Sequence, residues 1–573
     1  MELTIRIGGE AGQGLQLIGT VLTTYFKRLG YHVFTHQDYM SRVRGGHNFY
    51  QIRLADKPVC CSRQQVDLLL ALDSNTIDLH EDALSQQGRI IYDSEMCKRQ
   101  GVGRHFLDMP FTAIVKELAV AEVMVNSAAV GAVIGILGLD LQPFAEIIAD
   151  FIGKKGTEVV TTNIKVAQAG HDHAVSDYAG LFSLPAPEAG LQSHILINGS
   201  QAMGLGALMS GCKFYSAYPM TPSTGIMVFL AAKAAEHGLV VEQAEDEIAA
   251  INMALGASYA GVRAMTGTSG GGYALMTEGV SLAGITETPI VIAEVQRPGP
   301  ATGLPTRTEQ SDLFFVLYGG HGEFPRVVFT PGTPEQAFYL TNKAFHLAEK
   351  YQIPVIVQSD QYLADCQWTL PEFAEEGLLQ EDFRLRGQAL QERESYQRYG
   401  YSDSGITPLA VPGASRHLVV VDSDEHDEDG HIIEDAETRN RMMTKRLFNK
   451  LPLLQAEMTP PEHYGAAEPD FLLIGYGSTW GLLKEVVDHC PPQKAVAMLH
   501  FSEVWPLPLS DTFDYVALLE QATTICVENN ATSQFATLLH SQTGHRCTHR
   551  INRFDGRPFT LDNLMEALND YLC

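Results

Sequence analysis

The spacing of apolar residues along the chain predicts strands and helices in alternation. At the N-terminus, an apolar run over residues 3–7 leads into a glycine-rich turn, and helical spacing follows as far as Gly30. Further strand-like runs are found at residues 32–35, 50–54, 66–72 and 90–92. Short strands separated by helical patterns are typical of a largely parallel α/β sheet.

The same alternation starts again twice further along the chain. A second α/β unit begins at residues 194–199, after a proline-containing stretch at 183–190 that favours a linker, and a third begins at residues 470–475. A chain of 573 residues is also too long for one compact core. We therefore predict a multidomain α/β protein, with domains at 1–185, 194–395 and 466–573 and an irregular, charged linker over 396–465.

One apolar segment, residues 123–139, has to be weighed as a membrane span. It is shorter than a span requires, contains Asn126 and Ser127, and is rich in alanine and glycine. We expect a buried helix that packs closely against its neighbours. The first residues show no basic segment followed by an apolar core, so we expect no secretory signal and a cytoplasmic location.

The overall charge excludes one class of ligand. The chain carries 68 acidic and 40 basic side chains, a formal net charge of −28, which argues against a nucleic-acid partner. The nine cysteines include no Cys-x-x-Cys pair and no spacing typical of zinc or iron–sulfur sites. If this protein takes part in one-electron chemistry, another chain must carry the electrons.

The first glycine-rich turn, Gly9-x-x-Gly12-x-Gly14, stands between a strand and a helix. Glycines there let the backbone approach a diphosphate, and the helix N-terminus offers free amides to the anion. A turn without a ligand would have the same pattern. A second segment, Arg42-Val-Arg44-Gly45-Gly46, can clamp phosphates or form a solvated turn. Together the two segments favour a phosphate-bearing ligand, although the spacing departs from the dinucleotide fingerprint and disfavours a nicotinamide dehydrogenase.

Two prolines bracket Thr221 in the segment Tyr218-Pro219-Met-Thr-Pro-Ser-Thr-Gly. They restrict the backbone, so the hydroxyl group is presented with little freedom. The alternative is a proline-rich turn before a helix whose N-cap is Ser223 or Thr224. The residues alone leave both interpretations open.

Several acidic residues precede an alanine-rich apolar run within residues 242–256. Carboxylates in that position indicate a helix N-terminus, where they interact with the positive end of the helix dipole. Glu247 is followed directly by Ile-Ala-Ala-Ile, so it is the acid that we expect to be buried. A buried carboxyl group can share a proton with a ring nitrogen.

A third segment begins with a triple glycine at Gly270 and ends at Asp312. The triple glycine lacks the lysine of a P-loop, so we reject that interpretation. Arg297 ends an apolar strand at residues 290–295, and the carboxyl ends of parallel strands are where such sheets bind ligands. A guanidinium group there can hold a substrate carboxylate through two hydrogen bonds.

These segments closely resemble the α subunit of 2-oxoacid:ferredoxin oxidoreductases, with the γ domain fused ahead of it. The resemblance is carried by Tyr-Pro-Met-Thr-Pro-Ser-Thr-Gly-Ile from Tyr218, Glu-Asp-Glu-Ile-Ala-Ala-Ile-Asn-Met-Ala-Leu-Gly from Glu245, Thr-Ser-Gly-Gly-Gly from Thr268 and Gln-Arg-Pro-Gly-Pro-Ala-Thr-Gly-Leu-Pro-Thr from Gln296. It covers essentially the whole chain, although Ala11 replaces a glycine common in the broader family. It implies a γ-type α/β domain, a doubly wound domain similar to those that bind the pyrimidine of thiamine, and an α/β domain similar to the C-terminal one of transketolase.

The resemblance also implies a role for each candidate residue. Glu247 matches the glutamate that hydrogen-bonds the pyrimidine ring nitrogen of thiamine diphosphate, with Tyr218 and Pro219 on the same side. Thr221 matches a substrate-side threonine, and Arg297 matches the arginine that binds the carboxylate of the 2-oxoacid. On the coenzyme A side, the implied residues are Gly9, Gly12, Gln13, Gly14, Arg44, Gly45 and Gly46.

A thiamine enzyme needs a Gly-Asp-Gly type motif with a later asparagine to hold magnesium and diphosphate, and the chain has none. The resemblance therefore implies a β subunit that carries Mg²⁺, the diphosphate site and a 4Fe–4S cluster, and that passes electrons to ferredoxin. We expect no metal site on this chain and a dimer of α–β heterodimers.

The fused layout and the segment Gly-Leu-Pro-Thr-Arg-Thr-Glu-Gln from Gly303 look most like the 2-oxoglutarate group. The expected reaction converts 2-oxoglutarate, coenzyme A and oxidised ferredoxin into succinyl-CoA, carbon dioxide and reduced ferredoxin, or the reverse. Pyruvate, branched-chain and aryl-pyruvate substrates are alternatives. Arg307 or a group on the partner chain would bind the distal carboxylate. A non-catalytic subunit that binds coenzyme A is the alternative from another class.

Overall fold

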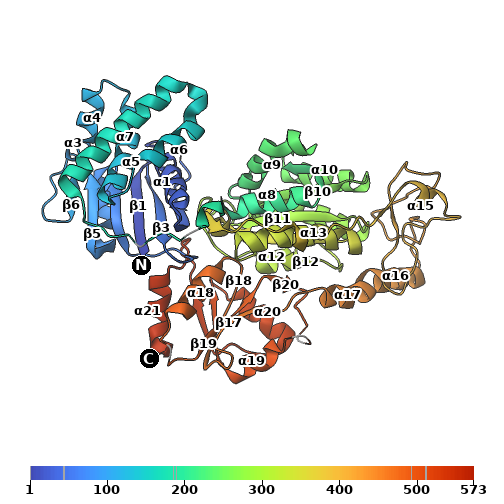
Figure 1. The fold of residues 1–573 in the computed structure, drawn as a ribbon. Helices are drawn as coiled ribbons and strands as arrows, with labels where there is room; N and C mark the ends of the chain where they lie inside the picture. The colour runs from blue at the N-terminus through green and yellow to red at the C-terminus, as the bar shows by residue number, and fades with distance from the viewer. Residues whose placement is uncertain are drawn as a thin grey trace. The chain divides into compact units, whose positions relative to one another are not determined.

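The computed structural model of the chain describes residues 2–42, 45–184, 186–188, 190–491, 493–509, 511 and 513–572 (Figure 1). Backbone contacts divide the chain into two compact units. The first contains Met1–Ile197, Cys366–Glu372 and Thr560–Asp570, and the second contains Asn198–Asp365, Phe373–Phe559 and Tyr571–Cys573. Two short segments from the second half of the sequence therefore belong to the N-terminal unit.

The N-terminal unit is built on one sheet of eight strands in the order β6-β5-β4-β1-β3-β2-β14-β7. The strands are β1 (Glu2–Glu10), β2 (His32–Asp38), β3 (His47–Ala55), β4 (Val66–Ala71), β5 (Leu84–Tyr92), β6 (Phe106–Asp108), β7 (Ile195–Ile197) and β14 (Trp368–Leu370). Strands β1, β4, β5 and β6 are parallel, whereas β3, β2, β14 and β7 pair antiparallel. The prediction of a largely parallel sheet is therefore wrong for β3, β2, β14 and β7. The loop between β2 and β3 is too short for a helical crossover, so these strands form a hairpin.

The helices of this unit are α1 (Leu15–Leu29), α2 (Ser74–His80), α3 (Ser94–Cys97), α4 (Phe111–Glu117), α5 (Val125–Ile136), α6 (Gln142–Ile152), α7 (Thr157–Tyr178) and most of α21 (Leu561–Leu572). Helices α5 and α7 cross so closely that a Cβ atom at Gly131 would overlap with the carbonyl group of Ala167. Nearly all of α5 is buried, so the prediction of a buried helix within residues 123–139 is confirmed. In the described ranges, no helix has the length and hydropathy that crossing a membrane requires.

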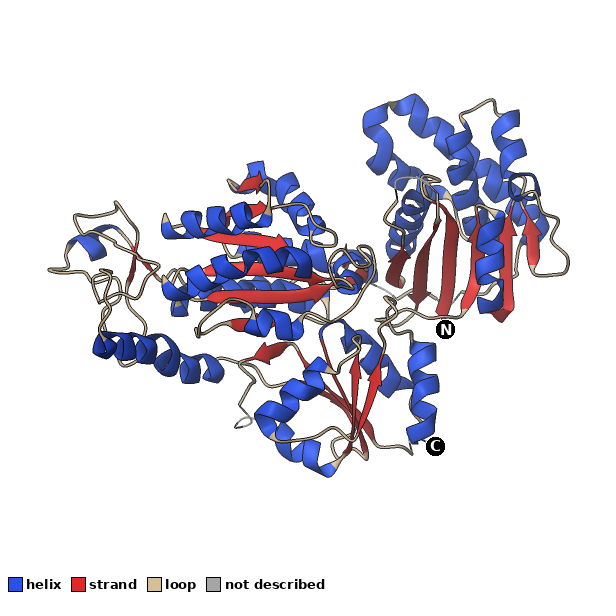
Figure 2. Cartoon of the chain, turned by 180° about the vertical axis from the view of Figure 1, so that it is seen from behind, coloured by secondary structure: helices blue, strands red, loops and turns tan. Residues whose placement is uncertain are grey.

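The larger sheet of the second unit has seven strands in the order β20-β12-β13-β11-β10-β8-β9. All strands except β20 are parallel, and helices lie on both faces of the sheet (Figure 2). The strands are β8 (Cys212–Ala217), β9 (Val240–Gln243), β10 (Arg263–Thr268), β11 (Ile290–Gln296), β12 (Val327–Phe329), β13 (Pro354–Asp360) and β20 (Glu503–Trp505). The helices are α8 (Gly199–Met209), α9 (Thr224–His237), α10 (Glu247–Tyr259), α11 (Gly270–Ile285), α12 (Leu313–Tyr318), α13 (Pro334–Tyr351) and α14 (Gln361–Asp365). The predicted multidomain α/β fold is confirmed.

The smaller sheet of the second unit has the order β17-β19-β18-β21-β22 and is parallel except for β17. Its strands are β17 (Glu462–Gly465), β18 (Phe471–Tyr476), β19 (Val496–Phe501), β21 (Thr523–Glu528) and β22 (His549–Asn552), and its helices are α18 (Trp480–His489), α19 (Tyr515–Gln521) and α20 (Gln534–Thr543). One hydrophobic core joins the two sheets, because Tyr273 and Ile292 share it with Tyr476 and Phe535. The central and C-terminal sheets are therefore parts of one compact unit.

The segment 396–465 is not irregular throughout, so that prediction is partly wrong. It contains α16 (Ala436–Met443), a π-helical turn (Thr444–Asn449) and α17 (Lys450–Ala456), in addition to the short β16 (Leu409–Ala410), while β15 (Arg384–Leu385) and α15 (Gly387–Gln391) precede it. Lys445 and Lys450 are at most 1% exposed, and both form ion pairs with the buried Glu287. The π-helical turn buries Lys445 and Arg446, and α17 buries Lys450 beside Leu454, so this segment lacks the apolar periodicity on which the sequence prediction depended.

Candidate functional site

The three residues predicted to carry the chemistry follow the carboxyl ends of three parallel strands. Thr221 comes after β8, Glu247 after β9 and Arg297 directly after β11. Carboxyl ends of parallel strands meet at one edge of a sheet, so the fold brings these residues to the same edge. The roles of the three residues stay predictions.

Glu247 is the first residue of α10. Asp246 is its N-cap, and the Asp246 side chain accepts a hydrogen bond of 2.8 Å from the backbone N–H of Ala249. The helix therefore begins where the acidic run predicted it. Glu247 is only 3% exposed, and its Oε1 atom has no hydrogen-bond partner among the described residues. A buried polar atom without a partner is costly, which suits a site that is completed by a ligand.

Glu247 lies against the triple glycine at the start of α11. A Cβ atom at Gly272 would lie 2.5 Å from Glu247 Oε1 and would overlap with the hydroxyl group of Thr268. Any other residue at position 272 would therefore displace the carboxyl group. Gly272, the last residue of the triple glycine, therefore leaves room for the carboxyl group of Glu247.

The loop that contains Thr221 accepts hydrogen bonds from Arg297 and from Ser269. Thr221 and Pro222 are joined by a cis peptide bond. The Arg297 guanidinium group donates a hydrogen bond of 2.7 Å from Nη1 to the backbone oxygen of Thr221. Ser269 donates from its hydroxyl group to the sulfur of Met220 at 3.3 Å. The structure thus brings Thr221 and Arg297 into direct contact and links the loop to the glycine segment beside Glu247.

Ser223 occupies the N-cap position of α9, as one of the two alternatives predicted. Its side chain makes no capping bond and instead donates to the backbone oxygen of Met220 at 2.8 Å. Tyr218, predicted on the thiamine side, is 40% exposed. Its exposed ring is available to a ligand or to another chain.

Three acidic side chains near Arg297 were not predicted. Glu294 is fully buried in β11, and burial, with Asp312 as the next cause, raises its pKa well above the usual range. Burial raises the pKa of Asp312 to about 6, and the positive charge of Arg297 opposes that rise. Burial also raises the pKa of Asp360, at the end of β13. The sequence contains one sign of these buried acids, which is the glutamate inside the apolar run Ile-Val-Ile-Ala-Glu-Val. Charged residues are rarely buried without a partner, so a glutamate in a core strand is unusual.

Gln310 connects the loop after Arg297 to the smaller sheet. Its backbone N–H donates to the oxygen of Asn529 at 2.7 Å, and its side chain accepts from the N–H of Asn529 at 3.0 Å and donates to the oxygen of Tyr476 at 2.9 Å. Arg307, in the same loop, is buried. The motif around Gln310 therefore fixes the wall of the site to the neighbouring sheet.

The glycine-rich turn of the N-terminal unit has the conformation that glycine favours. Gly12 and Gly14 have φ angles of 99° and 83°, and Gly14 is the N-cap of α1. The side-chain oxygen of Gln13 accepts a hydrogen bond of 2.7 Å from the backbone N–H of Glu10. A cavity of about 750 Å³ opens at this turn. Its polar lining side chains are Gln13, Glu95, Lys98, Thr112, Lys116, Glu122 and Asn126, and the backbone of Gly12 lies beside them.

The second predicted phosphate segment is described only in part. Gly45 and Gly46 have φ angles of 73° and 76°, a conformation that glycine adopts at low cost. Arg44 lies outside the described residues.

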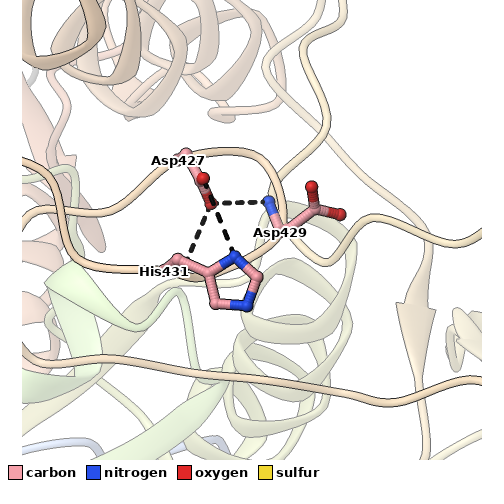
Figure 3. A group of neighbouring side chains, drawn as sticks. All are labelled: Asp427, Asp429 and His431. Atoms are coloured by element: carbon pink, nitrogen blue, oxygen red, sulfur yellow. Dashed lines mark hydrogen bonds and ion pairs between the residues drawn. The ribbon is translucent and has the colours of Figure 1, made fainter.

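Asp427, Asp429 and His431 form a group that has the residue types of a metal site (Figure 3). Asp427 uses its Oδ1 atom to accept hydrogen bonds from the backbone N–H groups of Asp429 at 3.0 Å and His431 at 2.9 Å. These bonds close the turn between His426 and Ile432. The turn explains the arrangement without a metal.

Two families match the chain. "Pyruvate flavodoxin/ferredoxin oxidoreductase, thiamine diP-bdg" matches residues 205–445, and "Pyruvate ferredoxin/flavodoxin oxidoreductase" matches residues 4–173. The first match contains Thr221, Glu247 and Arg297, and the second contains the glycine-rich turn. A thiamine-diphosphate-binding domain is therefore present, as predicted.

Relatives match over nearly the whole chain. The 2-oxoacid:ferredoxin oxidoreductase subunit alpha of Sulfolobus sp is 30% identical over 99% of this chain and 96% of the relative. The 2-oxoglutarate oxidoreductase subunit of Mycobacterium tuberculosis is 27% identical over 88% of this chain and 82% of its own length. The solved 2-oxoglutarate:ferredoxin oxidoreductase from Magnetococcus marinus, with 2-oxoglutarate, coenzyme A and succinyl-CoA bound, superposes with a TM-score of 0.92 at 30% identity and full coverage of both chains. The chain belongs to the family of thiamine-dependent 2-oxoacid:ferredoxin oxidoreductase alpha subunits.

Proposed function

We propose that this chain is the α subunit of a cytoplasmic complex that interconverts 2-oxoglutarate, coenzyme A and oxidised ferredoxin with succinyl-CoA, carbon dioxide and reduced ferredoxin. The substrate is supported by the relatives named for 2-oxoglutarate and by the Magnetococcus marinus structure. The observation that carries the proposal is Glu247, a buried carboxyl group with one unpartnered oxygen beside a glycine that leaves it room.

Glu247 would hold the pyrimidine side of thiamine diphosphate, together with Tyr218 and Pro219. Its unpartnered Oε1 atom fits a ring nitrogen, because the pair can share one proton inside a buried site. When bound, thiamine diphosphate supplies the nucleophilic carbon that decarboxylation of a 2-oxoacid requires. Glu247 would hold the ring nitrogen through a shared proton, and its burial beside Gly272 and Thr268 would keep water away from that bond.

Thr221 and Arg297 would form the substrate side. The guanidinium group of Arg297 carries the positive charge that a 2-oxoacid carboxylate needs. Its bond to the backbone oxygen of Thr221 joins the two residues at the carboxyl edge of the sheet. Arg307 is the candidate on this chain for the distal carboxylate, and a group on the partner subunit is the alternative.

The N-terminal unit would dock coenzyme A. The proposed residues are Gly9, Gly12, Gln13 and Gly14, with Arg44, Gly45 and Gly46 as the second phosphate segment. The cavity beside Gly12 supports this assignment, because Lys98 lines it together with apolar side chains of α4 and α5. Lys116, Glu95 and Glu122 also line it, and Lys116 is paired with Glu95, so Lys98 is the cation that a phosphate would meet there. Lysines suit phosphates, and an apolar wall suits the rest of a long coenzyme arm.

A β subunit would supply Mg²⁺, the diphosphate site and the 4Fe–4S cluster. The face beside Glu247 supports such a partner. Helices α10 and α11 expose large apolar side chains there, since Ile248, Met253 and Leu275 are 52%, 42% and 49% exposed. On a chain with a net charge of −28, exposed apolar side chains of that size are suited to a protein interface. The complex would be a dimer of heterodimers.

We propose one role for each of the predicted domains. Residues 1–185 would dock coenzyme A, residues 194–395 would hold the pyrimidine side of the site, and residues 466–573 would form the transketolase-like C-terminal domain. Residues 396–465 would connect the last two.

The experiment is to purify the chain with its cysteine-rich partner and to assay ferredoxin reduction with several 2-oxoacids. We expect the highest kcat/KM with 2-oxoglutarate and dependence on coenzyme A. Glu247→Gln should keep the complex assembled and lower kcat by about 100-fold or more, the usual worth of a positioned proton-transfer group. Full turnover by the isolated chain, or an active Glu247→Gln complex, would refute the proposal. A preference for pyruvate would correct only the substrate.

A further inference from the structure

An arginine and two histidines form a hydrogen-bonded chain in the N-terminal unit, and the function proposed so far gives this chain no role. Arg6 Nη1 lies 3.1 Å from His80 Nδ1, and His80 Nε2 lies 2.8 Å from His47 Nε2. Arg6 also donates a hydrogen bond of 2.6 Å from Nη2 to Gln51 Oε1, which fixes its side chain. His47 directly follows Gly46, so the chain ends beside the second predicted phosphate segment.

The hydrogen bonds of this chain have a fixed direction. A guanidinium group donates hydrogen bonds and accepts none, so His80 Nδ1 is the acceptor and the proton of His80 is on Nε2. His80 then donates to His47 Nε2, which leaves the proton of His47 on Nδ1. Burial, with Arg6 and His47 as the next causes, lowers the pKa of His80 to about 3, so the ring is neutral at pH 7. The Nδ1–H group of His47 is therefore a donor.

This donor has no acceptor among the described residues, and the same unit contains an acceptor without a donor. His47 Nδ1 and Asp73 Oδ2 are both buried atoms that lack a hydrogen-bond partner in the described part of the chain. Asp73 is held in place by its other oxygen, Oδ1, which accepts from the backbone N–H and from the hydroxyl group of Thr76 at 2.7 and 2.8 Å. Its free oxygen is therefore fixed in position.

The side chains of His47 and Asp73 meet at Gly8, near the end of β1. A Cβ atom at Gly8 would lie 3.2 Å from His47 Cε1 and 3.0 Å from Thr76 Oγ1, the hydroxyl oxygen that is bonded to Asp73. Asp73 is also the first of the charged groups that raise the pKa of His47, against the larger lowering that burial causes. Buried polar atoms without partners are costly, so this donor and this acceptor indicate a ligand group that both accepts and donates.

Asp73 has the position at which doubly wound folds bind ribose. Strand β1 leads into the glycine-rich turn, and its parallel neighbour is β4, which ends two residues before Asp73. In dinucleotide-binding folds, an acidic residue after the strand beside the first one accepts a hydrogen bond from a ribose hydroxyl group. Here the β2–β3 hairpin separates β1 from β4 in the sequence, so the spacing from the glycines does not reveal the acid.

We propose that His47 and Asp73 bind the 2′-hydroxyl group of the ribose of coenzyme A, which accepts a hydrogen bond from His47 Nδ1 and donates one to Asp73 Oδ2. This inference rests on the proposed docking of coenzyme A in the N-terminal unit. Ionised phosphates only accept hydrogen bonds, and the carboxylate of Asp73 would repel them, so a hydroxyl group fits better. Arg6 and His80 are positioning residues, because they keep the proton of His47 on Nδ1.

The test is calorimetric binding of coenzyme A and of 2′-deoxy-coenzyme A to the complex assembled with the partner subunit. We expect the unmodified complex to bind coenzyme A at least about tenfold more tightly, because the analogue leaves a buried donor and a charged acceptor unpaired. Asp73→Asn keeps the side-chain oxygen that caps α2 but replaces the free acceptor by an N–H group. His47→Gln keeps an acceptor for His80 but loses the Nδ1–H group. Both variants should lose most of the preference for coenzyme A.

Asp435→Asn is the matched control, since Asp435 caps α16 in the same way and accepts a hydrogen bond of 2.8 Å from the backbone N–H of Thr438. It should keep the full preference, and circular dichroism verifies the fold of each variant. Equal affinity for the two ligands in the unmodified complex, or an undiminished preference in Asp73→Asn or in His47→Gln, would overturn the proposal.

A third ligand separates the ribose from the other hydroxyl group of the coenzyme. An analogue that lacks the hydroxyl group of the pantoyl arm should show the same change of affinity, if any, in the unmodified complex and in Asp73→Asn. A loss of affinity with this analogue that disappears in Asp73→Asn would overturn the ribose assignment. Failure of coenzyme A itself to bind the complex would instead refute its docking in the N-terminal unit, so the two failures are distinguishable.

Discussion

Glu247 and Gly272 are matched across the contact between α10 and α11, since the carboxyl group of one fills the space that a side chain of the other would need. This contact explains why position 272 is a glycine, which phosphate binding does not explain. It also means that the position of the carboxyl group can be changed without altering Glu247 itself.

Gly272→Ala should therefore lower activity while the fold is kept. The new methyl group would meet Glu247 Oε1 at 2.5 Å and push it from its place. A displacement of about 1 Å at a catalytic group costs on the order of 100-fold in rate. The measurement is kcat of the reconstituted complex, with circular dichroism to verify the fold. Gly271→Ala is the matched control, because its nearest neighbour, the backbone oxygen of Ala301, is 3.8 Å away. Equal activity in the two variants would contradict this account.

Gly131→Ala should destabilise the N-terminal unit. A methyl group there would overlap with the backbone of α7 at Ala167, which cannot move aside as a flexible side chain can. We expect a loss of about 1–3 kcal/mol in the free energy of unfolding, or more if the helices cannot separate. Urea denaturation followed by circular dichroism measures it. Gly153→Ala, at a position with open space around it, should be neutral or slightly stabilising.

Part of this fold and of the candidate site could be predicted from the sequence, and part could not. The strand-to-helix turns, the buried α5 and the start of α10 were predicted, because each depends on local spacing and on residues adjacent in sequence. The raised pKa values of Glu294 and Asp312 were not predicted, since they result from burial by residues distant in the sequence. The antiparallel β2–β3 pair was also missed, because the prediction used strand spacing and ignored loop length. Helix α17 was missed for a different reason, which is that Lys450, one of its two buried residues, is held by an ion pair and adds nothing to an apolar pattern.

Glu287→Gln should strongly destabilise the second unit. Lys445 and Lys450 would keep their charges inside the protein without a counter-charge. Removing one partner of a buried ion pair typically costs about 3–5 kcal/mol. Chemical denaturation of the complex measures the loss. Replacing all three residues, with Glu287→Gln, Lys445→Met and Lys450→Met together, should recover most of the stability. If the single variant is as stable as the original chain, the ion pairs do not hold this segment.

Glu294→Gln should make stability less dependent on pH. Burial raises the pKa of Glu294 well above its ordinary value of 4.5, so the folded chain keeps a proton that the unfolded chain releases. The resulting stabilisation is complete below about pH 4.5 and is lost as pH rises through the folded pKa. The neutral variant avoids this loss. We expect its advantage in unfolding free energy to grow from pH 5 to pH 8, measured by denaturant titration at each pH. The exposed Glu335→Gln should show no such trend.

The tight crossing of α5 and α7 limits how the coenzyme cavity can evolve. Val125 and Asn126, at the start of α5, form part of the wall of that cavity, while Gly131 further along fixes the same helix to its neighbour. The wall cannot retreat as a whole to admit a bulkier ligand. New ligand specificity in this cavity would have to come from substitutions of individual side chains at the N-terminus of α5, while the backbone of the helix keeps its position.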